Sequence, residues 1–506
     1  MPTENSSALP YLVFLIPAGL ALLVWLVGRF QSRVQEALVL LGTASSFVIS
    51  LLIARHTINQ EILTSWNREL YADALSALVL VIISGVGLFA AIYSQTYMRH
   101  QRLLDRVGKD VTERRLTAFY ALFLLFVSTM LWGCVTNNVI MLYVAVEATT
   151  IASGLLVGFY LDKRGLEAAY KYLMLLTVGI TFALFGCVLL YSAATVHLPG
   201  VHAFLMSDIR GVAGEIPRSI ALLVMAFAIV GFGTKAGIAP FHPWLPDAHA
   251  EAPTPISVLL SGVMLKMAVY ALARIVMIFY PTFSPVSIFL VALGAFTMLL
   301  GIAMALVQDD LKRLLAYSSV SQMGYVVMGV GLGTYLGVYG GLFHMLNHGL
   351  SKALLFMCAG AVIYSTGARR ISELGGLGKS MPVTSACFFI GALAVSGMPP
   401  LNGFMSKITI FIATASAHQW WATGVAMFTS LLTMVVLTHA AWAVFWGQPK
   451  CETDGPNTRE EIKEAPAGLL IGMVPLAAAC VLLGIYPQAV YPMLNAATES
   501  MLFFLK

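Results

Sequence analysis

The sequence predicts an all-α polytopic membrane protein with about fourteen transmembrane helices. Hydrophobic residues make up 59% of the 506-residue chain and charged residues only 10%. Because soluble proteins carry roughly 25% charged residues, this composition does not suit a water-facing surface. The apolar runs are about 20 residues long, as a membrane helix requires. They lack the alternation of β-barrel strands, which favours helices.

The ends of the apolar runs set the predicted spans. No charged linker divides the chain, so we expect one membrane domain, and no basic cluster suggests a nucleic-acid partner. The segment after MPTENSSALP lacks a preceding basic region and is predicted to be the first span. The predicted spans are 11–28, 35–54, 74–95, 116–134, 138–160, 170–195, 218–248, 255–279, 285–307, 313–333, 338–363, 382–414, 420–447 and 467–487, with a short amphipathic end in 488–506.

Two of these runs contain residues that interrupt a helix. The seventh contains Gly237 and three prolines, and the twelfth contains GMPPLNGF at Gly397–Phe404. Proline removes a backbone donor, and broken helices at membrane depth are tolerated only against protein or a water-filled cavity. Paired broken helices are typical of transporters built from inverted repeats. We therefore expect two inverted five-helix repeats, spans 4–8 and 9–13.

The predicted repeats divide the chain into four parts. Helices 1–3 precede the first repeat, and helix 14 with the tail follows the second. The predicted boundaries are 1–115, 116–279, 280–447 and 448–506.

The distribution of lysine and arginine predicts the orientation. Of 29 such residues, 19 fall in loops after odd-numbered spans, including Arg99, Arg102, Arg106, Lys109, Arg114 and Arg115. Six fall in the other loops and the C-terminus, which leaves 29 − 19 − 6 = 4 inside spans. Because cytoplasmic loops are rich in Lys and Arg, both termini are predicted to lie outside.

Four lysines, Lys235, Lys266, Lys352 and Lys407, lie inside predicted spans. A lysine at the centre of a membrane helix costs about 2.5–3.5 kcal/mol on insertion scales. Snorkelling to the interface is the alternative explanation. It fits Lys266 poorly, because this residue lies about eleven positions into its span.

One carboxylate, Glu147, lies in the apolar run NVIMLYVAVEATTIASGLLVGF. It has no charged neighbour in its own helix, so a partner must come from another helix. Lys235 is the natural candidate. A purely structural ion pair is the alternative, although it would neutralise only one lysine of the four.

The eleventh span, GGLFHMLNHGLSKALLFM, carries His344, His348 and Lys352 at a spacing of four residues. Four residues rise about 6 Å along a helix, so the three lie near one face. This spacing suits side chains bridged by single waters, with ordinary core histidines as the alternative. A metal needs further ligands, and neither a cysteine nor a carboxylate accompanies the pair. We expect neither a metal nor a cofactor in this chain.

These residue types suit proton transfer. In general, burial disfavours the charged form of a lysine, and a carboxylate that approaches or withdraws changes how tightly a lysine holds its proton. Histidine changes charge near neutral pH. The predicted proton-translocation residues are Glu147, Lys235, Lys266, His344, His348, Lys352 and Lys407.

Four motifs support a family resemblance. PFHPWLPDAHAEAPTPISVLLSGVMLKMAVYALAR (Pro240–Arg274) resembles the signature of the antiporter-like subunits of respiratory complex I. That family is shared with Mrp-type multisubunit cation/proton antiporters and membrane-bound (group 4) nickel–iron hydrogenases. The further matching motifs are QDDLKRLLAYSSVSQMGY (Gln308–Tyr325), HMLNHGLSKALLFMCAGAV (His344–Val362) and SGMPPLNGFMSKITIF (Ser396–Phe411).

The resemblance implies roles for the matching residues. Glu147 corresponds to a fifth-helix glutamate that pairs with Lys235, and Lys266 to an eighth-helix lysine. His344, His348 and Lys352 fall on the central polar axis. Lys407 corresponds to the terminal residue of that axis on the broken twelfth helix.

The resemblance also implies a function. The expected function is a proton-translocating, non-catalytic subunit of a redox-driven complex of the hydrogenase or complex I type. The alternatives are a subunit of a Na⁺/H⁺ antiporter and a non-conducting scaffold. Expected partners are other membrane subunits, the lipid bilayer, protons or Na⁺, and, in redox-driven members, an arm with iron–sulfur and nickel–iron or quinone-reactive subunits. The expected location is the cell inner (plasma) membrane.

Overall fold

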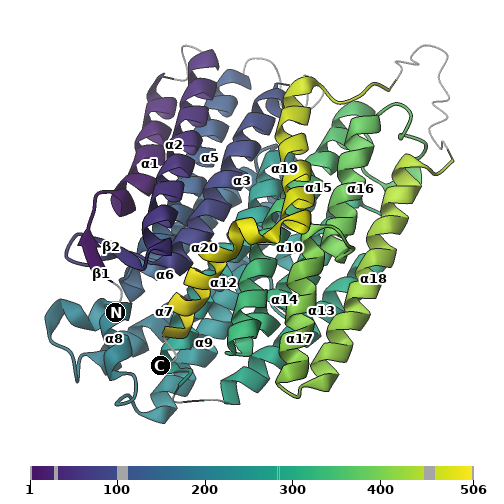
Figure 1. The fold of residues 1–506 in the computed structure, drawn as a ribbon. Coiled ribbons are helices and arrows are strands. Elements are labelled where there is room, and N and C mark those ends of the chain that lie inside the picture. Colours follow the sequence, from purple (N-terminus) through teal and green to yellow (C-terminus); the bar gives the residue numbers. More distant parts are fainter. Residues whose placement is uncertain are drawn as a thin grey trace.

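A computed structural model describes residues 3–27, 32–99, 112–281, 283, 285–448 and 462–503. It is a bundle of long helices that run roughly side by side (Figure 1). Three of the basic residues that predict the orientation, Arg102, Arg106 and Lys109, and the C-terminal Lys506 lie outside the described residues. The long uninterrupted helices are α1 (Leu9–Val27), α2 (Ser32–Ile58), α3 (Ala74–Met98), α5 (Thr112–Val135), α6 (Val139–Val157), α7 (Lys163–Ala194), α9 (Arg218–Ala236), α13 (Pro285–Leu306), α14 (Leu311–Gly331), α15 (Tyr335–Thr366), α18 (Trp420–Phe445) and α19 (Ala467–Ile485).

The helical membrane class is confirmed. Within the described residues, twelve helices are long and apolar enough to cross a membrane, and each corresponds to a predicted span. The predicted span 313–333 forms α14, whose middle carries buried polar residues such as Ser318 and Gln322. The span 382–414 is interrupted. The count of fourteen and the inverted repeats therefore stay predictions.

Both expected helix interruptions are present. Helix α9 ends at Ala236, and the chain resumes as α10 (Trp244–Glu251). Helix α16 (Pro382–Ser396) is likewise followed by α17 (Asn402–Ser416). Gly237 and Gly397 end the first halves with φ of 70° and 82°, a left-handed conformation that glycine adopts without steric cost.

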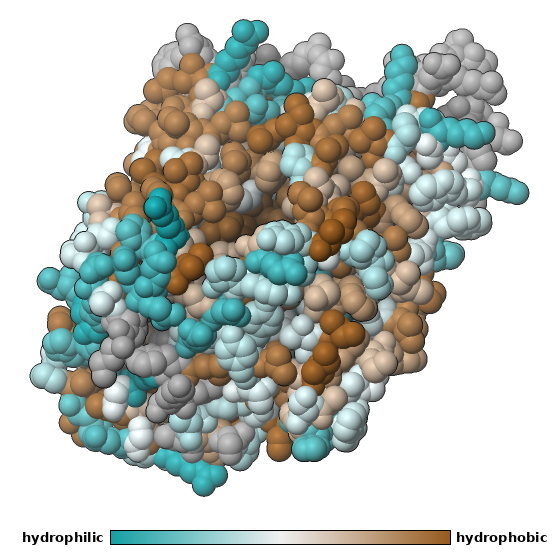
Figure 2. Space-filling view, in the orientation of Figure 1, coloured by the Kyte–Doolittle hydropathy of each residue, from teal (hydrophilic) through white to brown (hydrophobic). Residues whose placement is uncertain are grey.

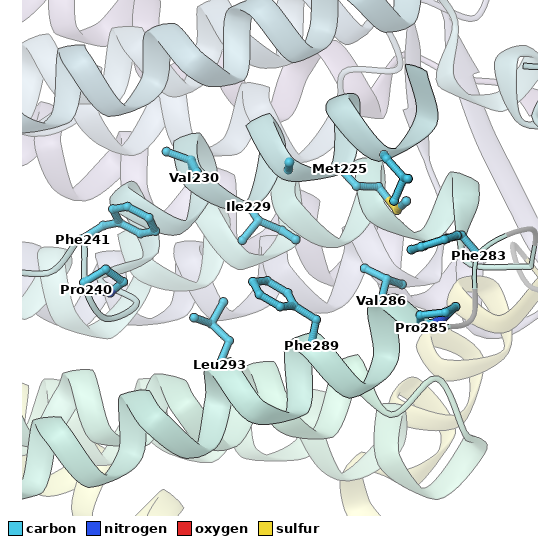
Figure 3. A pocket seen from close by; sticks show the side chains of 12 residues that line it. Met225, Ile229, Val230, Pro240, Phe241, Phe283, Pro285, Val286, Phe289 and Leu293 are labelled. Atoms are coloured by element: carbon cyan, nitrogen blue, oxygen red, sulfur yellow. The ribbon is translucent and has the colours of Figure 1, made fainter. Parts of the chain in front are cut away.

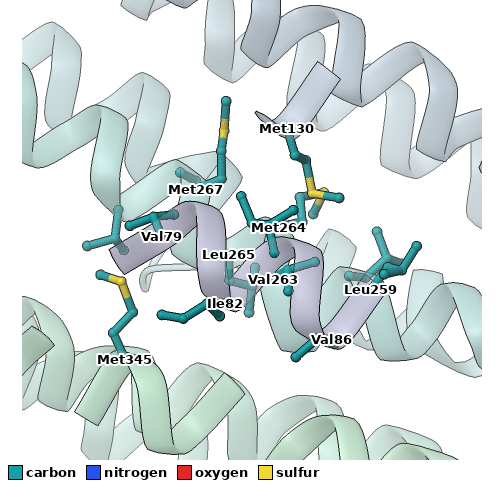
Figure 4. Close-up of a cluster of buried hydrophobic side chains, with 14 of the residues drawn as sticks. Val79, Ile82, Val86, Met130, Leu259, Val263, Met264, Leu265, Met267 and Met345 are labelled. Carbon is teal, nitrogen blue, oxygen red and sulfur yellow. The ribbon is translucent and has the colours of Figure 1, made fainter. Parts of the chain in front are cut away.

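The eighth predicted span lies at the centre of the bundle. It consists of α11 (Thr254–Leu259), a π-helical turn (Leu260–Met264) and α12 (Leu265–Phe279), and every residue in these elements is buried. Figure 4 shows its side chains packed between α3, α5 and α15, with Val79, Met130 and Met345 among the contacts. Any charged group on this helix is therefore surrounded by protein and does not reach the lipid headgroups.

Two smaller features complete the fold. A three-stranded sheet of β1 (Thr3–Ser6), β2 (Glu61–Ser65) and β3 (Leu70–Ala72) was not expected from the sequence. The tail forms α20 (Tyr491–Phe503), which crosses the front of the bundle in Figure 1. Figure 2 shows hydrophobic residues over much of the upper part of this face, with hydrophilic residues towards the lower left.

Candidate functional site

The four lysines predicted inside spans are all buried. Lys235 and Lys407 are 1% exposed, and Lys266 and Lys352 are 0% exposed. Within the described residues, none of them forms an ion pair with a carboxylate, whereas arginines and surface groups do. A buried charge without an opposite charge is unfavourable, so these four sites require a specific explanation.

Lys235 lies in the last turn of α9, next to the helix interruption. Its Nζ donates a 2.7 Å hydrogen bond to the Thr150 hydroxyl on α6. The same Nζ lies 6.0 Å from the centroid of the Tyr172 ring. The C-terminal end of a helix carries partial negative charge, which favours a cation at this position.

Glu147 lies one helical turn before Thr150, on the same helix. One carboxylate oxygen accepts a 3.3 Å hydrogen bond from Thr177. Its charge acts on Lys235, but the two side chains form no direct ion pair. The side chain is half-buried rather than deep, because the outer faces of α6 and α7 are exposed. Glu147 and the hydroxyl that accepts from Lys235 therefore lie on the same helix, one turn apart.

Lys266 follows the π-helical turn of the eighth span. Its Nζ donates to the backbone carbonyl of Ser261 inside that turn. A π-helical turn shifts the hydrogen-bond pattern, and such turns often occur at functional sites. The Ser261 hydroxyl lies 2.8 Å from that of Ser319 on α14, which extends the polar contacts to the next helix.

The eleventh span, α15, presents the predicted histidines and lysine to its neighbours. Lys352 donates to the Ser318 hydroxyl and, at 3.0 Å, to the Leu315 carbonyl of α14. His344 Nδ1 lies 3.0 Å from the Ser406 hydroxyl of α17. The rings of His344 and His348 lie 6.1 Å apart. Both ring nitrogens of His348 are buried without a hydrogen-bond partner in the described protein.

Lys407 lies on α17, after the second helix interruption. Its Nζ donates to the carbonyl of Ser396 at 3.3 Å and to the Ser430 hydroxyl at 3.2 Å. Ser396 is the last residue of α16, so Lys407 reaches back to the C-terminal end of the first half-helix. Both interruptions therefore place a lysine amine at the C-terminal end of the preceding half-helix.

The predicted residues form two groups. Glu147 and Lys235 make the first. The second lies deeper, and its members act electrostatically on one another: Lys266, His344, His348, Lys352 and Lys407. Within the described residues, no hydrogen bond joins the two groups. Nor do three or more His, Cys, Asp or Glu side chains come together in a way that could hold a metal ion.

One further buried histidine, His249 on α10, was not predicted from the sequence. This residue is fully buried against Phe356, with the rings 4.8 Å apart, and neither ring nitrogen has a hydrogen-bond partner in the described protein. The positive charges of Lys266, Lys352 and Lys312 act electrostatically on this ring. Its place in the second half of a broken helix was the available signal. The accepting hydroxyls of Thr150, Ser318 and Ser430 were also missed, because their partners lie far away in the sequence.

A buried ion pair corrects one part of the sequence analysis. Arg274 lies inside the predicted span 255–279, but the charge count left it among the six residues outside the spans; it is buried in α12, where its guanidinium binds Asp73 with one N–O distance of 2.7 Å. Moving it from the loops changes the bias from 19 against 6 to 19 against 6 − 1 = 5. Burial acts to raise the pKa of Asp73, but Arg274 and hydrogen bonds from Ser76 and Ser500 outweigh it and lower that pKa.

Comparison with known proteins places this chain in a family. The family described as "NADH:quinone oxidoreductase/Mrp antiporter, TM" matches residues 136–433. A second family, "NADH-Ubiquinone oxidoreductase (complex I), chain 5 N-terminus", matches residues 64–106. The matched region contains all seven predicted residues.

Three relatives represent three kinds of complex. NADH-quinone oxidoreductase subunit N of Desulforudis audaxviator is 34% identical over 84% of this chain and 83% of its own. A hydrogenase-4 component F homolog of Methylacidiphilum infernorum is 33% identical over 67% of this chain and 71% of its own. A Na(+)/H(+) antiporter subunit of Alkalihalophilus pseudofirmus is 32% identical over 89% of this chain and 56% of its own.

Solved structures share the fold along nearly the whole chain. A chain of the membrane-bound sulfane sulfur reductase, an archaeal respiratory membrane complex, has a TM-score of 0.84 at 25% identity, with 98% of each chain covered. A chain of the Mrp complex of Dietzia sp. has a TM-score of 0.84 at 21% identity, covering 99% of this chain and 100% of that one. The chain therefore belongs to the family of antiporter-like membrane subunits shared by NADH:quinone oxidoreductase, Mrp antiporters and related hydrogenases.

Proposed function

We propose that this chain translocates protons as a subunit of a redox-driven membrane complex, of the hydrogenase or complex I type. The observation that carries the proposal is the set of four buried lysines bonded to hydroxyls and carbonyls instead of carboxylates. Permanent charges at such sites would be unfavourable. An amine that takes up and releases a proton avoids this, and a neighbouring hydroxyl can both accept and donate a hydrogen bond.

The two groups of residues have different proposed roles. In the first, Glu147 modulates how Lys235 holds its proton, and Thr150 keeps the amine within reach of that carboxylate. In the second, Lys266, His348 and Lys352 with their neighbours carry the proton towards Lys407. Because like charges act on one another there, a proton that arrives at one member favours release from the next.

Electrons would be handled by other subunits, because the proposed role of this chain is ion movement alone. Relatives named as a hydrogenase component and a quinone oxidoreductase subunit support a redox-driven complex. The relative named as a Na(+)/H(+) antiporter subunit supports the second candidate, in which a proton gradient drives sodium export. The presence of all four buried lysines argues against a non-conducting scaffold. The proposed location is the plasma membrane, with both termini outside.

Reconstitution of the whole complex tests the proposal. The complex is purified through a tag on this chain and placed in liposomes with a pH-sensitive dye inside. Pumping that starts with hydrogen or NADH as electron donor supports the redox-driven assignment. Proton movement that instead requires a sodium gradient and no electron donor supports the antiporter assignment.

A variant pair assigns the movement to this chain. Lys352→Met removes a buried amine and is expected to abolish proton movement, whereas Lys379→Met alters an exposed lysine and should leave it unchanged. Equal proton movement in fully assembled Lys352→Met and wild-type complexes would refute a conducting role.

A further inference from the structure

An apolar groove lies between α9 and α13, away from the polar residues described above. Its volume is about 440 Å³, within the range of small-molecule binding sites. Figure 3 shows Met225, Ile229 and Val230 on one side and Val286, Phe289 and Leu293 on the other. All twelve lining side chains are apolar, so the groove suits a hydrocarbon rather than a polar ligand.

The groove is long and runs into the membrane. Along α9 its lining extends from Leu222 to Val230, which is about 12 Å of helix. At the deep end it is lined by Pro240 and Phe241, which belong to the interruption after Lys235. Leu222 and Phe289 on its rim are exposed. The groove is therefore open at the side and ends beside the broken helix.

A cation lies at the other end of the groove. Arg218 is the first residue of α9, one turn before Leu222, and its guanidinium carbon lies 4.9 Å from the centroid of the Phe283 ring. Phe283 also lines the groove, so this contact holds the guanidinium at the mouth. Within the described residues, Arg218 has no ion-pair partner. Guanidinium groups bind phosphate oxygens in a bidentate manner.

We propose that this groove binds one acyl chain of a phospholipid, whose phosphate is held by Arg218. The charge at the mouth and the apolar length behind it match the two parts of such a lipid. The N-terminus of α9, which has no side-chain cap, adds backbone N–H groups beside the phosphate. The bound chain packs against Pro240 and Phe241 and so lines the lipid side of the helix interruption.

Photo-labelling of the assembled complex tests this site. The probe is phosphatidylglycerol with a photoreactive diazirine in one acyl chain, present in vesicles of 1-palmitoyl-2-oleoyl-phosphatidylglycerol. After illumination, labelled peptides are mapped by mass spectrometry. We expect label on α9 and α13 next to the groove. A diacylglycerol with the same photoreactive chain has no phosphate and should label these peptides about tenfold less, as expected for one lost charge-assisted hydrogen bond.

Variants separate the two parts of the site. Ala226 lines the groove and is exposed, so Ala226→Phe fills the groove without disturbing the core and should abolish labelling. Leu223→Phe is the matched control, because Leu223 is exposed on the same helix but does not line the groove. Arg218→Gln should reduce labelling by phosphatidylglycerol to the level of diacylglycerol. The matched control is Arg55→Gln, at an exposed arginine in the last turn of α2.

Two results would overturn the proposal. The first is equal labelling of the Ala226→Phe and wild-type complexes. The second is a cross-link to another protein subunit from a photoreactive amino acid placed at Leu222, because it would show that a protein covers the groove. A lipid adduct at the same position supports the proposal. Neither measurement depends on proton movement, so this site stands or falls separately from the proposed function.

Discussion

The Lys235 amine donates a 2.7 Å hydrogen bond to the hydroxyl of Thr150, and Glu147 lies one helical turn before Thr150 on the same helix. The two side chains act electrostatically on each other without forming a direct ion pair. The charge of Glu147 could then hold or release the proton on Lys235 without any movement of the helices.

Removing that charge should slow proton movement. Glu147→Gln keeps the shape of the side chain, so the complex should assemble normally. We expect the rate of proton translocation to fall by about tenfold or more, because loss of the modulating charge needs to raise the barrier by only about 1.4 kcal/mol for a tenfold effect. The rate is measured in liposomes containing the purified complex. Glu167→Gln is the control, because Glu167 is an exposed residue of α7 that pairs with Lys171. A wild-type rate in assembled Glu147→Gln complex would contradict the proposed switch.

The Thr150 hydroxyl should matter separately from its methyl group. Thr150→Val removes the acceptor for Lys235, and loss of a partner for a buried polar group costs about 1–3 kcal/mol of stability. We expect slower proton movement and a lower melting temperature of the purified complex. Thr150→Ser retains the hydroxyl and should recover both. If the serine variant is as impaired as the valine variant, side-chain packing rather than the hydrogen bond explains the effect.

The buried pair of Asp73 and Arg274 should stabilise the fold. Arg274→Met leaves Asp73 buried without its partner, which typically costs about 3–5 kcal/mol. The double variant Asp73→Leu/Arg274→Met should be more stable than either single variant, because no charge is left unpaired. Thermal denaturation of the purified complex measures this. A double variant less stable than both single variants would contradict the explanation.

The same pair predicts a dependence of stability on pH. The pKa of Asp73 is lowered in the folded protein by Arg274 and hydrogen bonds, against the effect of burial. A lowered carboxyl pKa stabilises the fold at pH values above the ordinary pKa of aspartate. This contribution is lost as the pH falls through the lowered value. Wild-type complex should therefore lose stability in acid more steeply than the Asp73→Leu/Arg274→Met variant, as measured by melting temperature at a series of pH values.

The sequence predicted those features that depend on local composition. Apolar runs located the helices, and Gly237 and Gly397 with their prolines located both interruptions, because the physical reasons for them lie within a few residues. Contacts between distant residues could not be found in this way. The buried pair of Arg274 with Asp73 was not predicted, because the two residues lie 201 positions apart. The pairing of β1 with β2 joins the polar segment TENS to a strand 58 positions away, and neither segment indicates this pairing by itself.

The predicted orientation can be checked by chemical labelling. The charge bias places the loop after α15 in the cytoplasm and the N-terminal residues outside. Cysteine introduced at exposed Arg370 should react with a membrane-impermeant thiol reagent only in inside-out vesicles. Cysteine at Glu4 should react in intact cells. The native cysteines are first replaced to avoid background, and labelling at 370 from the outer face would reverse the assignment.

Ordered water should connect the two groups of polar residues. Both ring nitrogens of His348 and Nε2 of His344 are buried without a partner among the described residues, and buried polar groups are normally satisfied by protein or by water. Within the part of the chain that the structure describes, no hydrogen bond leads from Lys235 to Lys266, so a proton needs water between them. A map of the assembled complex that resolves water should show molecules about 2.7–3.2 Å from the His348 nitrogens and in the space between the two lysines.

A pair of variants tests the role of these waters. His348→Phe should remove the waters bound to this histidine and slow proton movement. The control His197→Phe, at a histidine that pairs with Glu215 beyond the end of α7, should do neither. A dry, fully packed barrier between Lys235 and Lys266, both at rest and during turnover, would show that protons do not pass from one group to the other.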